Sequence, residues 1–140
     1  MKNPEKPKYR WTDAWLLLAV ALASKDRSAN LVDIIACGDG INHAIFDESE
    51  LHGGFCRLIQ GEWIVDKGGL FEVTRRFKKE IQPHLSGFLS DQYETLIKVL
   101  GAEKNLTGET IPHPENIGKN YAGLTSEQIQ KAYQQYTQKQ

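Results

Sequence analysis

The 140-residue sequence has little of what marks a disulfide-bonded or membrane-spanning protein. Its two cysteines, Cys37 and Cys56, cannot build a disulfide scaffold, which favours a reduced, cytoplasmic chain. The longest apolar run, Ala14 to Ala23, is about half as long as the roughly 20 residues that span a bilayer. We therefore expect no disulfide framework and no membrane partner.

A secretory leader is the alternative interpretation of this apolar run, because basic residues precede it and Ala-Leu-Ala stands before Ser24. Two features favour a buried first helix instead. Asp13 adjoins the run, and the Ala-Leu-Ala lies within the run rather than after a polar spacer.

Charge of one sign is also lacking overall. Seventeen Lys and Arg stand against eighteen Asp and Glu, for a net charge of -1, so no global basic field indicates a nucleic-acid binder. The charges are nevertheless segregated: the net charge is +3 over residues 1–11, -6 over 12–73, +3 over 74–90 and -1 over 91–140.

No catalytic or metal-binding pattern is recognisable. Cysteines 37 and 56 and histidines 43 and 52 lie close in sequence but have neither a CxxC nor an HxxxH zinc spacing. No glycine-rich loop follows a strand and opens a helix, as a phosphate-binding loop requires. No Ser/His/Asp or paired-carboxylate arrangement can be placed either. We expect no enzyme activity, no metal and no cofactor.

The pattern predicts helices first. Residues 1–11 should form a flexible arm, and Thr12 should cap a helix that ends near Ser24. A second helix over 30–37 should stop at Gly38, with a tight turn over 38–40.

The third helix is the best signalled. Asp47 and Glu50 have the spacing of a capping box. An apolar stripe from Leu51 to Ile59 follows, and Gly61 ends the helix. β-rich runs on both sides of Gly68-Gly69 then predict a hairpin over residues 62–73.

Helical patterns return after the hairpin. Thr74 should cap a helix that stops or kinks at Pro83, and a further helix should cover 88–100. A long loop over 101–123 precedes a last helix, whose capping box is formed by Thr125 and Gln128. The predicted organisation is an arm (1–11), a domain (12–82) and a helical extension (83–140).

This order resembles a winged helix-turn-helix. The residues that carry the resemblance are Asp47-Glu48-Ser49-Glu50-Leu51, Arg57 to Ile64 and Phe71-Glu72-Val73-Thr74. They are similar to the x-x-E-L, R-L-x-x-x-G-x-I and F-x-L-T segments of MarR- and PadR-like bacterial regulators. The resemblance covers about residues 12–80. It implies a mainly α (α+β) fold with a two-stranded β-wing and a C-terminal helical extension.

The resemblance also implies a DNA-binding transcriptional regulator that reads duplex DNA with the helix over 48–60 and the wing over 62–73. Arg57 would pair with guanine, Gln60 with adenine, and Ser49 with a phosphate. The full set of DNA-binding candidates is Ser49, His52, Gly53, Arg57, Gln60, Lys67, Arg75 and Arg76.

A protein-protein interaction module without DNA binding is the alternative. Residues 12–73 are acidic, and Gly53-Gly54 suits the close approach of another backbone. The basic run over 75–79 either compensates for the acidic domain or is an ordinary solvated helix face. The segment from Phe88 to Leu100, with the last helix, is the expected homodimer element, and packing within one chain is its alternative.

Overall fold

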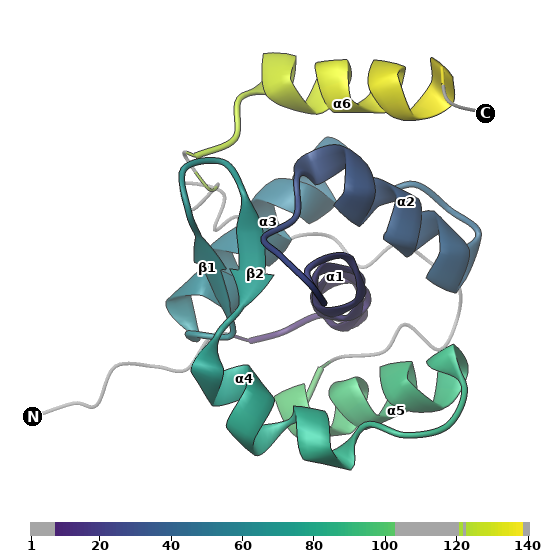
Figure 1. The fold of residues 1–140 in the computed structure, drawn as a ribbon, viewed down its shortest axis with the longest axis vertical. Coiled ribbons are helices and arrows are strands. Elements are labelled where there is room, and N and C mark those ends of the chain that lie inside the picture. Colours follow the sequence, from purple (N-terminus) through teal and green to yellow (C-terminus); the bar gives the residue numbers. More distant parts are fainter. Residues whose placement is uncertain (1–7, 103–120, 122, 139–140) are drawn as a thin grey trace, which may run out of the picture.

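The computed structural model describes residues 8–102, 121 and 123–138, and they form a mainly helical fold with one small antiparallel sheet (Figure 1). The elements are α1 (Trp11–Ala23), α2 (Leu31–Asn42), α3 (Glu48–Gln60), β1 (Ile64–Asp66), β2 (Phe71–Val73), α4 (Arg75–Glu80), the 3-10 turn η1 (Gln82–His84), α5 (Leu89–Leu100) and α6 (Ser126–Gln138).

Helix α1 is the centre of the core. It is seen end-on in Figure 1, with the other elements around it, and every residue from Thr12 to Val20 is buried. It packs against α2, α3, α5 and β2. A helix that is apolar on nearly every side has to be covered on every side, as expected for its composition. In the described part of the chain, no helix is both long and apolar enough to cross a membrane.

The start of α1 differs from the prediction. The helix begins at Trp11 with Arg10 as its N-cap, so Thr12 is not the capping residue. The Asp13 carboxylate accepts the Arg10 backbone N–H at 3.0 Å, which satisfies one of the free donors of the first turn. The arm is also shorter than predicted, because Tyr9 is buried and accepts a hydrogen bond from Trp63 Nε1 at 3.1 Å.

The predicted stop at Gly38 and the turn over 38–40 are wrong, because α2 continues to Asn42. Gly38 lies against the ring of Phe46, where a Cβ would clash. Its carbonyl also accepts the Trp15 Nε1 hydrogen at 2.8 Å. The glycine serves a tertiary contact here, and the helix ends instead at His43, which has a left-handed backbone (φ 55).

The capping box of α3 and the hairpin are confirmed. Asp47 and Glu50 exchange both hydrogen bonds, at 2.7 and 2.9 Å. β1 and β2 pair antiparallel, and Gly68 and Gly69 take positive φ at the tip. Ala29, between α1 and α2, adds a short antiparallel bridge to Phe71 of β2.

The C-terminal elements follow the predicted order. Thr74 caps α4 by accepting the Phe77 N–H at 3.2 Å, and the helix gives way to η1 around Pro83. α5 packs on α1, and α6 packs on α2. Thr125 and Gln128 form the expected capping box. The loop predicted over 101–123 lies almost entirely outside the described residues.

Candidate nucleic-acid interface

One face of α3 is fixed against the core. Leu51, Gly54, Phe55 and Leu58 are buried, and α3 packs on α1. A Cβ at Gly54 would stand 2.7 Å from Leu16 Cδ2, too close for a real side chain. The second glycine of the pair therefore lets α3 approach α1 closely, in agreement with the packing role that the sequence suggests.

Arg57 is not an outward-facing side chain, and this corrects the expectation that it is available to guanine. Its side chain is 11% exposed and pairs with Asp13, which is fully buried. Nε donates to Asp13 Oδ2 at 2.6 Å, and Nη2 donates to Oδ1 at 2.9 Å. A bidentate pair of this kind uses the same fork that would recognise guanine. Arg57 therefore neutralises a buried carboxylate between α1 and α3.

Gly53 is explained by the same ion pair. A Cβ at this position would lie 3.0 Å from the Arg57 guanidinium nitrogens. The arginine side chain thus passes over Gly53 on its way to Asp13. The structure thus brings Gly53 and Arg57 together, two of the predicted DNA-binding residues. Their contact serves the internal ion pair with Asp13 and leaves neither of them facing outward for DNA.

The N-terminal part of α3 is covered by the C-terminal part of the chain. His52 Nδ1 lies 3.1 Å from the Tyr121 carbonyl oxygen, so His52 is half-buried. Glu48 accepts hydrogen bonds from Ser126 and Gln130 of α6. Ser49 and Gln60, at opposite ends of the helix, are the two predicted α3 residues that are exposed.

Tyr121 joins α3 to the hairpin. Its ring lies 6.1 Å from that of Phe55 and 6.4 Å from that of Phe71, and its hydroxyl donates to Asp66. Burial and the Asp66 carboxylate raise the pKa of Tyr121 to about 12. Nothing in the local sequence marks Tyr121 as a packing residue, because it lies in a stretch with few apolar neighbours.

The hairpin tip offers a partly engaged cation. Lys67 Nζ lies 3.3 Å from Glu72 Oε2, and the lysine side chain is 57% exposed. The hydrogen bond from Ser28 and the charges of Lys67 and Lys78 lower the pKa of Glu72. Glu72 is thus a firmly ionised neighbour that weakens the field of Lys67.

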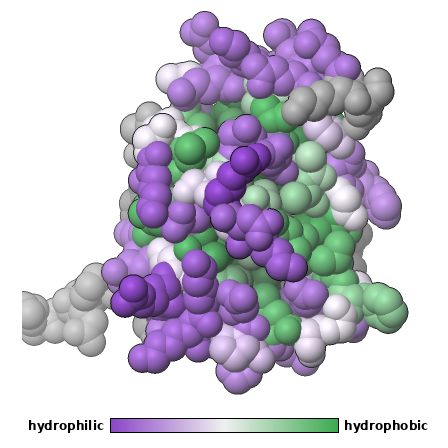
Figure 2. Space-filling model, viewed as in Figure 1, coloured by the Kyte–Doolittle hydropathy of each residue, from purple (hydrophilic) through white to green (hydrophobic). Residues whose placement is uncertain are grey.

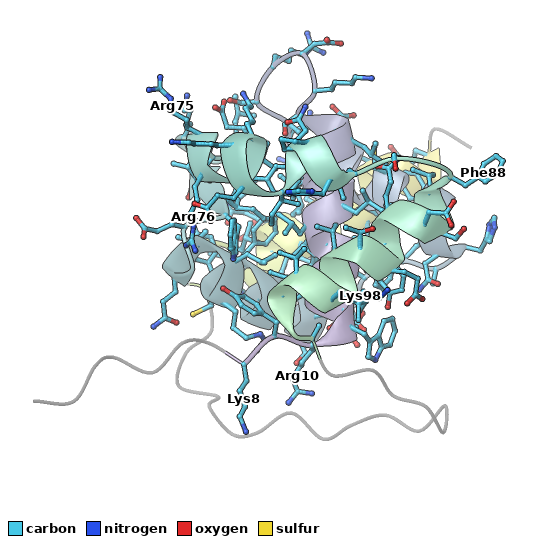
Figure 3. The ribbon with its side chains drawn as sticks, turned by 90° about the horizontal axis from the view of Figure 1, so that it is seen from below. Lys8, Arg10, Arg75, Arg76, Phe88 and Lys98 are labelled. Atoms are coloured by element: carbon cyan, nitrogen blue, oxygen red, sulfur yellow. The ribbon has the colours of Figure 1, made fainter. Side chains whose placement is uncertain are left out.

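Helix α4 is where exposed positive charge gathers. Arg75, Lys78 and Lys79 are exposed, and within the described residues none of the three side chains takes part in an ion pair. Figure 3 shows Arg75 and Arg76 projecting from α4. Figure 2 shows hydrophilic surface over this helix, at the lower left.

Arg76 connects this basic face to α3. Its guanidinium lies 3.9 Å from the centre of the Trp63 ring. Nη1 donates to the carbonyl of Gly61, the C-cap of α3, at 2.7 Å, and Nε reaches Glu80 at 3.3 Å. A guanidinium stacked on tryptophan is favourable and holds its position. The structure therefore places Arg76 beside the Gln60 end of α3, whereas Ser49 lies at the other end of that helix.

Asp13 is the structural residue whose role the sequence signals most clearly. A lone carboxylate at the start of an otherwise apolar helix requires a partner if it is buried. The sequence could show the need but not that Arg57, 44 residues away, meets it.

The residues that the structure describes include no group of three or more His, Cys, Asp or Glu side chains that could hold a metal ion. Cys37 and Cys56 are free, half-buried thiols. Comparison of the chain with protein-family models, with curated proteins and with solved structures finds no match.

Proposed function

We propose that this protein binds duplex DNA as a winged-helix regulator, with α4 and the C-terminal end of α3 as its main contact surface. The observation that carries the proposal is the basic face of α4, where Arg75, Lys78 and Lys79 are exposed and unpaired within the described residues. Unpaired cations that can neutralise phosphates supply most of the affinity of a protein for DNA.

The element order supports this proposal. Three helices, with α3 capped at both ends, lead into a two-stranded hairpin. The bridge from Ala29 to Phe71 ties the segment before α2 to the hairpin, so the hairpin is held on the helical body by backbone hydrogen bonds of 2.7 and 2.8 Å.

In this proposal, different residues contact the phosphates and recognise the bases. Arg75, Lys78 and Lys79 would neutralise phosphates and carry no sequence information. Gln60 is the exposed α3 side chain whose amide can form two hydrogen bonds with adenine. Ser49 lies eleven positions earlier on α3, about 16 Å along the helix axis, so it would meet a different part of the duplex.

The test is an anisotropy titration of a mixed duplex pool at 50 and 200 mM salt. We expect the wild-type protein to bind at 50 mM and to weaken steeply with salt. The triple variant Arg75→Gln, Lys78→Gln, Lys79→Gln should lose about two to three units of the logarithmic salt slope. Lys131→Gln, on the exposed face of α6 on the far side of the core, is the matched control and should bind like wild type. Equal slopes for wild type and triple variant would refute the proposal.

A protein-interaction module is the second candidate. The observation in its favour is the charge of α3. The arginine of this helix, Arg57, is paired with Asp13, and the first turn of the helix carries the acidic residues Glu48 and Glu50. This candidate predicts a partner with a basic face. Failure of the wild-type protein to bind the duplex pool even at 50 mM salt would favour the protein-interaction module. Recovery of a specific operator from a random pool would exclude it.

Homodimerisation stays a prediction, but the surface of α5 that could form the dimer is smaller than the sequence suggests. The apolar stripe of α5 that motivated it packs within the chain, since Leu96, Ile97 and Leu100 are buried. The apolar side chains of this segment that remain exposed to solvent, and so could form a dimer contact, are Phe88, which is 82% exposed, Leu89 and Val99. Light scattering at micromolar concentration decides: a mass near the chain's 15.8 kDa rules the dimer out.

A further inference from the structure

Helix α6 is held on the body of the protein by a narrow apolar stripe. It lies along α2, on the other side of the core from α4 (Figure 1), and it packs on α2. Its buried residues are Ile129 and Ala132, and Tyr133 and Tyr136 are half-buried. This is how an amphipathic helix binds a surface groove of another protein.

The N-terminal half of α6 contacts a carboxylate of α3. Ser126 Oγ donates to Glu48 Oε2 at 3.1 Å, and Gln130 Nε2 donates to Glu48 Oε1 at 3.4 Å. Both donors are neutral. A cation in place of either one would add the attraction of opposite charges to the hydrogen bond.

The surface beneath α6 is acidic further along as well. The Tyr136 hydroxyl donates to the Asp39 carboxylate of α2. Burial raises the pKa of Tyr133 to about 12, and three carboxylates at the start of α3 contribute to this shift, namely those of Asp47, Glu48 and Glu50. A helix on this surface therefore lies in a negative field.

Helix α6 does not neutralise this field. Among the residues that the structure describes, neither Asp39 nor Glu48 takes part in an ion pair. The basic residue of α6, Lys131, is exposed and lies two positions from Ile129, on the opposite side of the helix. The acidic surface is thus covered by a helix that packs on it but does not match its charge. A helix with so few buried residues opens more readily than the core.

We propose that the surface formed by α2 and the start of α3 binds a basic amphipathic helix of a partner protein, which takes the place of α6. The partner helix would bury apolar side chains where Ile129 and Ala132 lie, and would present Lys or Arg to Glu48. Complementary charge favours this partner and disfavours acidic ones. The site lies on the other side of the core from α4, so the proposal does not depend on DNA binding by α4.

Peptide binding to the full chain tests the site. The chain carries Ile129→Ala, which weakens the docking of its own α6 by leaving a cavity. Two labelled peptides of residues 124–138 keep the isoleucine. One carries Gln130→Arg, opposite Glu48, and the other carries Gln135→Arg, on the exposed side of the helix. In fluorescence anisotropy we expect the Gln130→Arg peptide to bind about threefold or more tighter than the other. The wild-type chain should bind it about tenfold or more weaker, because its own α6 competes.

Two further variants of that chain locate the charge. Glu48→Gln should bind the two peptides equally, since it removes the carboxylate that distinguishes them. Glu80→Gln on α4 removes an equal charge on the other side of the core and should keep the preference. Circular dichroism checks that each variant is folded. Tyr133→Phe, which removes the hydrogen bond to the Phe46 carbonyl without leaving a cavity, replaces Ile129→Ala if that variant does not fold.

The proposal is overturned if neither peptide binds the folded variant, or if the two peptides bind it equally well. It is also overturned if the preference persists in Glu48→Gln. A wild-type protein that is a dimer in light scattering, and a monomer with Ile129→Ala, would assign the surface to α6 of a second copy instead. None of these measurements includes DNA, so this proposal and the proposed function fail separately.

Discussion

Helices α3 and α4 differ in how available their positive charge is, although each carries arginine. The arginine of α3, Arg57, is 11% exposed and forms a bidentate pair with Asp13 in the core. On α4, Arg75 is exposed to solvent, and even Arg76, with 43% of its side chain exposed, lies on the surface. A residue type that could contact DNA in either helix is thus structural in one and free in the other, because of what faces it.

The largest expected effect comes from breaking the internal pair. Arg57→Ala leaves Asp13 buried without its cation and should lower the free energy of unfolding by about 3–5 kcal/mol. Denaturant unfolding of the variant beside wild type measures the loss. Arg75→Ala on α4 is the matched control and should stay within about 0.5 kcal/mol of wild type. Equal stability of the two variants would erase the distinction between the helices.

A smaller effect is expected where α3 approaches α1. Gly54→Ala places a methyl group 2.7 Å from Leu16 Cδ2 and should destabilise the protein by about 1–3 kcal/mol.

Gly40→Ala provides the control for this overpacking. Gly40 lies within α2, and a Cβ there meets nothing within 4 Å. The substitution should stabilise by about 0.5–1 kcal/mol, because alanine favours a helix over glycine. Thermal unfolding of both variants checks the opposite signs, and a shared sign contradicts the packing argument.

The salt dependence of DNA binding should distinguish the role of α4 from that of α3. Arg75→Gln should reduce the logarithmic salt slope of DNA binding by about 1 and weaken binding to all sequences uniformly. Gln60→Ala should instead change the sequence preference and leave the salt slope as it was. Binding to two duplexes at several salt concentrations separates these effects, and a salt-slope change in Gln60→Ala would contradict the division of roles.

The smallest effect concerns Tyr121, which joins α3 to the hairpin. Its pKa, raised by burial and by Asp66 from 10.0 to about 12, means that the folded state favours the neutral phenol. The resulting stability is fully present below pH 10 and is lost as the pH rises to about 12. Tyr121→Phe cannot ionise, so its deficit relative to wild type should shrink between pH 9 and pH 12. Parallel loss of stability by both proteins would contradict this assignment.

Features that depend on near neighbours in the chain were predictable from the sequence. The capping pairs Asp47 with Glu50 and Thr125 with Gln128 form as expected, since a residue three positions away satisfies the free backbone donors. The hairpin glycines were predicted for the same reason, because positive φ is a local requirement.

Features that depend on distant partners were not predictable. Gly38 has the sequence signature of a helix stop, but contact with Trp15 and Phe46 gives it another role. The Thr12 cap failed because Asp13 takes part in the Arg10 contact instead. In each case a plausible local signal was overruled by an interaction that the sequence pattern does not display.

The sequence by itself determined that this chain is mainly helical with one hairpin, which helices are capped, and that α1 has to be buried. Local hydrogen bonding and the periodicity of apolar residues fix these properties. Only the tertiary structure decided which cations remain for a ligand, because burial and pairing depend on residues far apart in the chain. Asp13 therefore turns Arg57 into a core residue, while α4 keeps its charge at the surface.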